Sequence, residues 1–171
     1  MKKRILVVDE GQPVRESLKR VLEGAGYDVL VAAGGLEAAI RLEQGRVDLV
    51  VLDLNLPNQS GWDVCERLIT RCPLVPVIII TGLSHQQRVA KAAGVGGLFE
   101  KPIEVMGLLK RVEELLAEPD GVRLARLCGD LEDFRHVKAK EGPAATAGAP
   151  RAQQGVVADR SGERSSGEHQ L

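Results

Sequence analysis

Reactive side chains follow four of the short apolar runs in this 171-residue sequence. Asp9 and Glu10 come directly after the first run, Asp53 and Thr81 after two later runs, and Lys101 just after the last. If these runs are strands of one parallel sheet, the five side chains meet at one edge, because ligand sites in such sheets lie beyond the carboxyl ends of the strands. The spacing therefore predicts a polar site with three acids, one hydroxyl and one ammonium group.

Three crowded carboxylates need a cation. Two unit charges about 4 Å apart repel by roughly 4 kcal/mol at an effective dielectric near 20. A divalent ion relieves that repulsion, and an all-oxygen ligand set suits Mg²⁺. Lys101 and the Thr81 hydroxyl could then bind further oxygens of a phosphoryl group. The set favours Mg²⁺-dependent in-line transfer of a phosphoryl group to a carboxylate.

The elements that position these residues alternate between strand and helix up to about residue 118. Most of the apolar runs are continuous and rich in β-branched residues, as in parallel strands buried on both faces. The segments between them have helical spacing, most clearly the stripe from Val105 to Leu116. This order predicts a doubly wound α/β domain with a five-stranded parallel sheet and helices on both faces. The expected strands are Ile5–Val8, Val29–Ala32, Leu49–Leu52, Val77–Ile80 and Gly97–Phe99.

The pattern changes after Pro119. Residues 119–139 have a loose apolar stripe broken by Gly129, which favours a linker or an extra helix over a docking or dimerising helix. From Gly142 to Leu171 large apolar residues are almost absent, so burial cannot offset the entropy of ordering. We expect residues 140–171 to be a disordered tail.

Composition argues against several classes of partner. The net charge is -1 and aromatic residues make up 2% of the chain, so a nucleic-acid-binding face is not expected. No apolar stretch reaches the roughly 20 residues that span a membrane, and the run at Ile5–Val8 is too short for a signal peptide. We expect a cytoplasmic protein whose three cysteines are idle free thiols.

The segment from Met1 to about Glu118 resembles the receiver domain of the response regulators of two-component signal transduction. The motifs that carry this resemblance are Ile5–Glu10, Asp48–Pro57 followed by Gly61, Ile78–Gly82 and Phe99–Pro102. Together they span the globular part of the chain. The resemblance implies a flavodoxin-like sheet with strand order 2-1-3-4-5 and a cis bond between Lys101 and Pro102.

The resemblance also implies a role for each residue of the site. Asp53 would accept a phosphoryl group from a sensor histidine kinase or a histidine phosphotransfer protein. The acids Asp9 and Glu10 would bind Mg²⁺ together with Asp53 and the main-chain carbonyl of Asn55. Such a domain catalyses only its own phosphorylation and dephosphorylation, so the chain is not expected to be an enzyme in the ordinary sense.

Thr81 and Lys101 would form the switch pair that senses the phosphoryl group. A downstream protein would dock on the face from about Gly82 to Leu116. The face of the last helix, which carries the stripe from Val105 to Leu116, is the expected place for a homodimer. One departure concerns Leu98, which stands where the family usually has an aromatic switch residue, with Phe99 beside it. This departure puts a ring-based switch in doubt.

Three alternatives compete with this interpretation. A pseudo-receiver that binds a partner without phosphorylation would not need all five site residues. A phosphohydrolase resembling the haloacid dehalogenase group needs a second acid two residues after the nucleophile, where this chain has Asn55, and an amide cannot shuttle protons at neutral pH. A transcription factor without its effector domain is less favoured than a stand-alone receiver that acts through docking.

Overall fold

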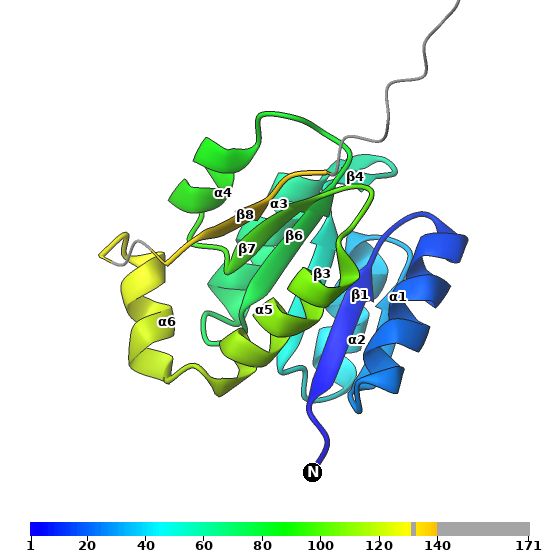
Figure 1. The fold of residues 1–171 in the computed structure, drawn as a ribbon. Helices are drawn as coiled ribbons and strands as arrows, with labels where there is room; N and C mark the ends of the chain where they lie inside the picture. Colours follow the sequence, from blue (N-terminus) through cyan, green and yellow to red (C-terminus); the bar gives the residue numbers. More distant parts are fainter. Residues whose placement is uncertain (131–132, 140–171) are drawn as a thin grey trace, which may run out of the picture. The chain divides into compact units, whose positions relative to one another are not determined.

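The computed structural model describes residues 1–130 and 133–139, and it contains a six-stranded parallel sheet (Figure 1). The strands lie in the order β2-β1-β3-β6-β7-β8. Their bounds are β1 (Arg4–Val8), β2 (Asp28–Ala32), β3 (Leu49–Asp53), β6 (Val77–Thr81), β7 (Gly97–Glu100) and β8 (Arg135–Val137). The first five positions confirm the predicted doubly wound order. The predicted disordered tail, residues 140–171, lies outside the described residues.

Helices cover both faces of the sheet (Figure 1). On one face lie α1 (Gln12–Gly24) and α5 (Val105–Ala117), and on the other α2 (Gly35–Gln44), α3 (Gly61–Arg71) and α4 (Gln87–Ala92). A further helix, α6 (Asp120–Leu127), follows α5. Within residues 1–130 and 133–139, none of these helices is long and apolar enough to cross a membrane.

The core consists of two apolar layers separated by the sheet. Every residue of β3 and β6 is buried, which explains why these strands have continuous apolar sequences instead of alternating ones. One layer joins the sheet to Leu18 of α1 and Leu108 of α5, and the other joins it to Val64 of α3 and Ala90 of α4. The central strands therefore end at fixed positions, and their last residues share one edge.

The sheet has six strands, not the predicted five. The sixth strand, β8, pairs in parallel with β7 along its outer edge. Its three residues, Arg135, His136 and Val137, include only one apolar side chain, so no apolar run marks them as a strand. The strand is held by tertiary contacts that sequence periodicity does not reveal.

A small hairpin, β4 (Asn55–Leu56) and β5 (Gln59–Ser60), lies between β3 and α3 and was not predicted either. Gly61 follows it and packs directly against the backbone of Leu54. A β-carbon at Gly61 would lie 2.3 Å from the Leu54 α-carbon and 2.5 Å from its carbonyl oxygen. Glycine is therefore required where α3 starts beside the loop that follows Asp53.

Replacing Gly61 by alanine should destabilise the domain. The new methyl group would displace backbone instead of a side chain, so we expect the free energy of unfolding to fall by about 1–3 kcal/mol. Gly24→Ala is the matched control, because a β-carbon there meets nothing within 4 Å, and it should be neutral or stabilise by about 0.5–1 kcal/mol. Urea unfolding measures both variants. Equal stability of the two variants would contradict the close approach.

Candidate functional site

Lys101 joins two buried carboxylates at the carboxyl edge of the sheet. Asp9 follows β1 and is 1% exposed, while Asp53 ends β3 and is 2% exposed. The Lys101 Nζ atom donates to Asp9 Oδ2 at 2.8 Å and to Asp53 Oδ2 at 2.7 Å. The two acids precede the lysine by 92 and 48 positions in the sequence, and the fold brings all three side chains together at one point. That point attracts positive charge.

Backbone amides fix the other oxygen of each acid. Gly11 N donates to Asp9 Oδ1 at 2.7 Å, and Asn55 N donates to Asp53 Oδ1 at 2.9 Å. Each carboxylate is thus locked in one orientation by the loop that follows it. The two Oδ2 atoms face the same point because these turns hold them there.

Glu10 and Asn55 lie at the exposed rim of the site. The Asn55 side chain donates to Glu10 Oε1 at 2.8 Å and so joins the two rim residues. A further residue, Arg15 of α1, was not predicted to belong here. Its guanidinium group donates to the carbonyl oxygens of Asp9 and Glu10 at 2.6 and 2.7 Å, which fixes the loop after β1. Contacts from a side chain to the main chain carry no sequence signal, and for that reason Arg15 was missed.

Thr81 is fully buried at the end of β6, and its hydroxyl group is turned toward the following loop. Its Oγ1 atom accepts a hydrogen bond from Leu83 N at 3.0 Å. The main chain beside it is joined to β7, because Lys101 N donates to the Thr81 carbonyl at 2.8 Å. The peptide bond between Lys101 and Pro102 is cis, as the resemblance to receiver domains implied.

Burial and charge both perturb the central acid. Burial raises the pKa of Asp53, and the nearby charge of Asp9 raises it further. Hydrogen bonds from Lys101 and from the Asn55 amide offset only part of this increase. Burial alone would lower the pKa of Lys101, but the two carboxylates outweigh it and raise this pKa above its usual value. Lys101 therefore stays charged between the acids.

The donor set fits a hard divalent cation. Within the described part of the chain, no group of three or more His, Cys, Asp or Glu side chains is arranged to hold a metal ion. Asp9 and Asp53 nevertheless direct two carboxylate oxygens at the point that the Lys101 ammonium group now occupies. Oxygen ligands of this kind suit Mg²⁺, which keeps several waters and needs few protein ligands.

Leu98, the departure from the aromatic pattern, is fully buried in the core layer on the α4 side of the sheet. Phe134, which precedes β8, packs against the same layer. Phe99 points to the opposite layer, beside α5. Phe134, from the segment after α6, thus adds an aromatic side chain to the layer in which Leu98 lies.

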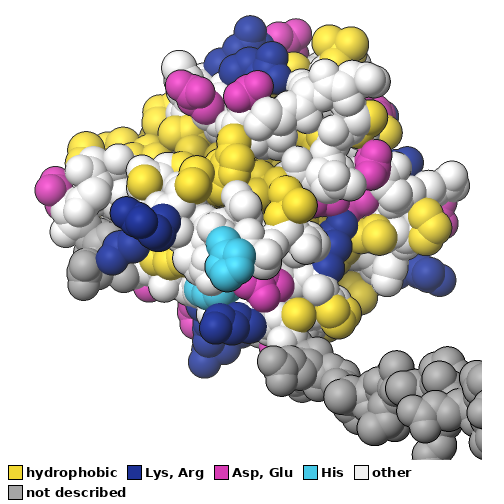
Figure 2. Space-filling model, turned by 90° about the horizontal axis from the view of Figure 1, so that it is seen from above, with side chains coloured by type: hydrophobic (Ala, Val, Ile, Leu, Met, Phe, Trp, Pro, Cys, Tyr) yellow, Lys and Arg dark blue, Asp and Glu magenta, His cyan; other side chains and the backbone are white. Residues whose placement is uncertain are grey.

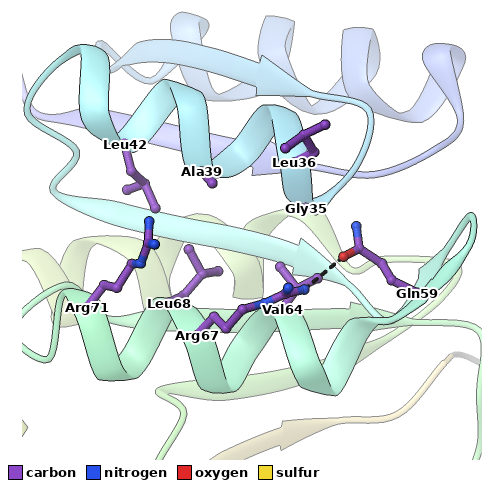
Figure 3. Close-up of a pocket in the computed structure, with 9 residues that line it drawn as sticks. All are labelled: Gly35, Leu36, Ala39, Leu42, Gln59, Val64, Arg67, Leu68 and Arg71. Carbon is purple, nitrogen blue, oxygen red and sulfur yellow. Dashed lines mark hydrogen bonds between the residues drawn. The ribbon is translucent and has the colours of Figure 1, made fainter.

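A cavity of about 190 Å³ lies away from this site, between α2 and α3 (Figure 3). Its wall contains Leu36, Leu42 and Leu68, and Arg67 at its rim donates to Gln59 Oε1 at 2.8 Å. None of the predicted site residues lines it. Figure 2 shows the molecule from above the view of Figure 1, and apolar, acidic and basic side chains are mixed on that face.

Comparison with known proteins assigns the chain to a sequence family. Residues 5–113 match the family described as the response regulator receiver domain. Relatives include the response regulator MprA of Mycobacterium sp. strain KMS, 40% identical over 115 residues that cover 66% of this chain and 50% of the relative. MprA of Mycobacterium avium strain 104 is 37% identical over 134 residues, which cover 75% and 59% of the two chains.

Solved structures show the same fold. A CheY-like response regulator receiver domain protein from Methanospirillum hungatei JF-1 is 31% identical, with a TM-score of 0.64, and the match covers 68% of this chain and 94% of that one. The response regulator TrrA of Thermotoga maritima, solved in complex with Mg²⁺-BeF, is 32% identical, with a TM-score of 0.62 and coverages of 66% and 98%.

The matches define how much of this chain the family explains. The chain spans about half the length of the curated relatives that it matches. The family match ends at residue 113, and α6 and β8 lie beyond it. The buried acids and the lysine between them lie within its limits, and the chain belongs to the response regulator receiver domain family of two-component signalling.

Proposed function

We propose that Asp53 is the phosphoacceptor of this receiver and takes its phosphoryl group from a phosphohistidine of a sensor histidine kinase or a histidine phosphotransfer protein. The observation that carries this proposal is the Lys101 ammonium group held between Asp9 and Asp53 at 2.8 and 2.7 Å. An Asp53 oxygen attacks phosphorus, the bond from phosphorus to the histidine nitrogen breaks, and an acyl phosphate forms. Lys101 then pairs with the transferred group.

Mg²⁺ would be held by Asp9, Glu10, Asp53 and the main-chain carbonyl of Asn55. The bound ion supplies positive charge to the phosphoryl oxygens during transfer. The Asn55 side chain donates to Glu10 Oε1 at 2.8 Å, so Glu10 would bind the ion through its other carboxylate oxygen. The complex of the similar TrrA receiver with Mg²⁺-BeF supports the assignment of this metal.

Thr81 and Lys101 form the switch that senses the phosphoryl group. The Thr81 hydroxyl has to leave the Leu83 amide, at 3.0 Å, to donate to a phosphoryl oxygen. The loop that would move contains His85, whose φ of 61° is a left-handed conformation that costs energy for a residue with a β-carbon. A strained loop beside the acceptor is suited to two arrangements.

The docking face would be the segment Gly82–Leu116, which contains α4, β7 and α5. Leu83, Val105 and Met106 are exposed apolar side chains on this segment, and a protein partner can bury them. A second copy of the chain is one such partner. The net charge of -1 gives no overall attraction to nucleic acid or to a membrane surface. We place the chain in the cytoplasm.

Replacing Asp53 by asparagine should abolish phosphorylation. Wild-type protein incubated with Mg²⁺ and acetyl phosphate should gain the mass of one phosphoryl group, and Asp53→Asn should gain none, because an amide cannot form the acyl phosphate. Asp63→Asn, which changes an exposed acid of α3, is the control and should behave as wild type. An unmodified wild type would favour a pseudo-receiver. An adduct of undiminished yield in Asp53→Asn would place the acceptor elsewhere.

The same substitution should stabilise the fold at neutral pH. Folding raises the pKa of Asp53, so between its unfolded-state pKa of about 4 and its higher native-state pKa the native state binds more protons than the unfolded state. Wild type therefore loses stability as pH rises through that range. Asp53→Asn lacks this loss. Thermal unfolding without Mg²⁺ should show a higher Tm for the variant at pH 7 and a smaller difference near pH 4. A lower Tm at pH 7 would contradict the direction of this pKa shift.

Thr81→Ala should separate phosphorylation from its structural response. Trp62 is the only tryptophan of the chain, and its indole nitrogen donates to Gln86 Oε1 at 3.0 Å, directly before α4. Movement of the loop after Thr81 should therefore alter its fluorescence. We expect the signal to change on phosphorylation of wild type and of Thr70→Ala, and to stay constant in phosphorylated Thr81→Ala. A full response in Thr81→Ala would rule out the hydroxyl as the sensor.

A further inference from the structure

Residues 133–139 bind the edge of β7 in the way that a sheet edge binds an extended peptide. β8 pairs Arg135 with Gly97, His136 with Leu98 and Val137 with Phe99. The two large apolar side chains of residues 133–139 lie on opposite faces of the sheet, since Phe134 packs on the layer that contains Leu98 and Val137 on the layer that contains Phe99. Main-chain pairing with alternate side chains in separate apolar seats is the recognition mode of strand addition.

The segment before β8 is fixed firmly, far from the acceptor. Arg123 of α6 is 2% exposed and donates to the carbonyl oxygens of Pro73, Val75 and Gly94 at 3.2, 3.4 and 2.7 Å. Burial lowers the pKa of this arginine to about 10, so it remains charged at neutral pH. These carbonyls precede β6 and β7, at the amino ends of the strands. α6 is therefore anchored at the edge opposite Asp53.

Asp133 marks the end of this firm anchor. Its carboxylate accepts from Arg111 at 3.0 Å and from Arg126 at 3.3 Å, and its carbonyl oxygen accepts from the same two arginines at 3.2 and 3.1 Å. Both arginines are buried. The chain thus enters β8 from a position that is held by four hydrogen bonds.

Beyond Asp133, the β8 segment contacts the side chain of Glu100, which is next to the acceptor site. His136 Nε2 lies 2.8 Å from Glu100 Oε1, and Ala139 N donates to Glu100 Oε2 at 3.4 Å. Glu100 is the residue before Lys101 and the register partner of Thr81 in β6. Glu100 is therefore adjacent in sequence to the lysine that contacts Asp53. A change in the position of Lys101 or Thr81 reaches Glu100 directly.

We propose that residues 133–139 are a strap that occupies the β7 edge while Asp53 is unphosphorylated and leaves it when Asp53 is phosphorylated; this rests on the phosphoacceptor function proposed above. The strap pairs with β7 in the unphosphorylated arrangement, in which Lys101 bridges two acids and the Thr81 hydroxyl accepts from the Leu83 amide. When both residues turn to the phosphoryl group, Glu100 and the end of β7 shift, and the strap fits less well. α6 keeps the strap tethered.

The strap covers part of the proposed docking face. With β8 in place, the outer edge of β7 is paired with the chain itself and cannot accept a strand from another molecule. Release would free that edge. Because coupling between two sites is reciprocal, a weakened strap should in turn favour the phosphorylated state.

Hydrogen exchange measured by mass spectrometry tests the release in the full chain. With Mg²⁺ and acetyl phosphate, and with the adduct confirmed by intact mass in the same sample, amides of residues 133–139 should exchange about fivefold faster or more. Amides of α6 should be unchanged. An adduct without faster exchange in residues 133–139 would overturn the strap and leave the phosphoacceptor intact. Absence of the adduct would overturn both proposals.

Two variants test the reciprocal effect. His136→Ala removes the contact with Glu100, and Phe134→Ala removes the aromatic side chain that packs on the core layer. Each variant should therefore show faster exchange in residues 133–139 without phosphodonor. Each should also raise the phosphorylated fraction at limiting acetyl phosphate. Arg71→Ala, which removes an exposed pair with Glu43 at 3.3 Å, is the matched control and should change neither. A loosened strap with an unchanged phosphorylated fraction would disprove the coupling.

Discussion

The ammonium group of Lys101 between the carboxylates of Asp9 and Asp53 is the interaction on which the arrangement of the site depends. It gathers the ends of β1, β3 and β7 at one point, and the buried acids could not both remain charged there without a cation. The sheet makes this possible because its central strands are buried along their whole length and end in register. Polar groups can then stand at the edge while the core stays apolar.

The same interaction explains how a static site can become a switch. Lys101 can pair with the two acids or with a phosphoryl group, and the Thr81 hydroxyl can pair with the Leu83 amide or with that group. Both choices lie at adjoining ends of β6 and β7, which are joined by the bond from Lys101 N to the Thr81 carbonyl. A single phosphorylation would therefore bias two neighbouring strands and any segment that is paired with them.

Apolar patterning and strand-end residues were enough to predict the central sheet and the meeting of Asp9, Asp53 and Lys101. Continuous β-branched runs have few alternatives to buried parallel strands, and the topology of such a sheet determines which side chains meet. The contact of Arg15 with two carbonyl oxygens and the pairing of β8 with β7 could not be predicted in this way. The first depends on a side chain that donates to the main chain five and six residues earlier. The second depends on a strand of only three residues that pairs with a distant segment.

We propose that Asp53 itself carries the phosphoryl group. The most direct measurement is reduction of the phosphorylated protein with borohydride, which converts an aspartyl phosphate to homoserine, followed by peptide sequencing in a mass spectrometer. Homoserine at position 53, and only when Mg²⁺ and acetyl phosphate were both present, is the predicted result. Homoserine at another aspartate, or an intact Asp53 in protein that carries the adduct, would contradict the account.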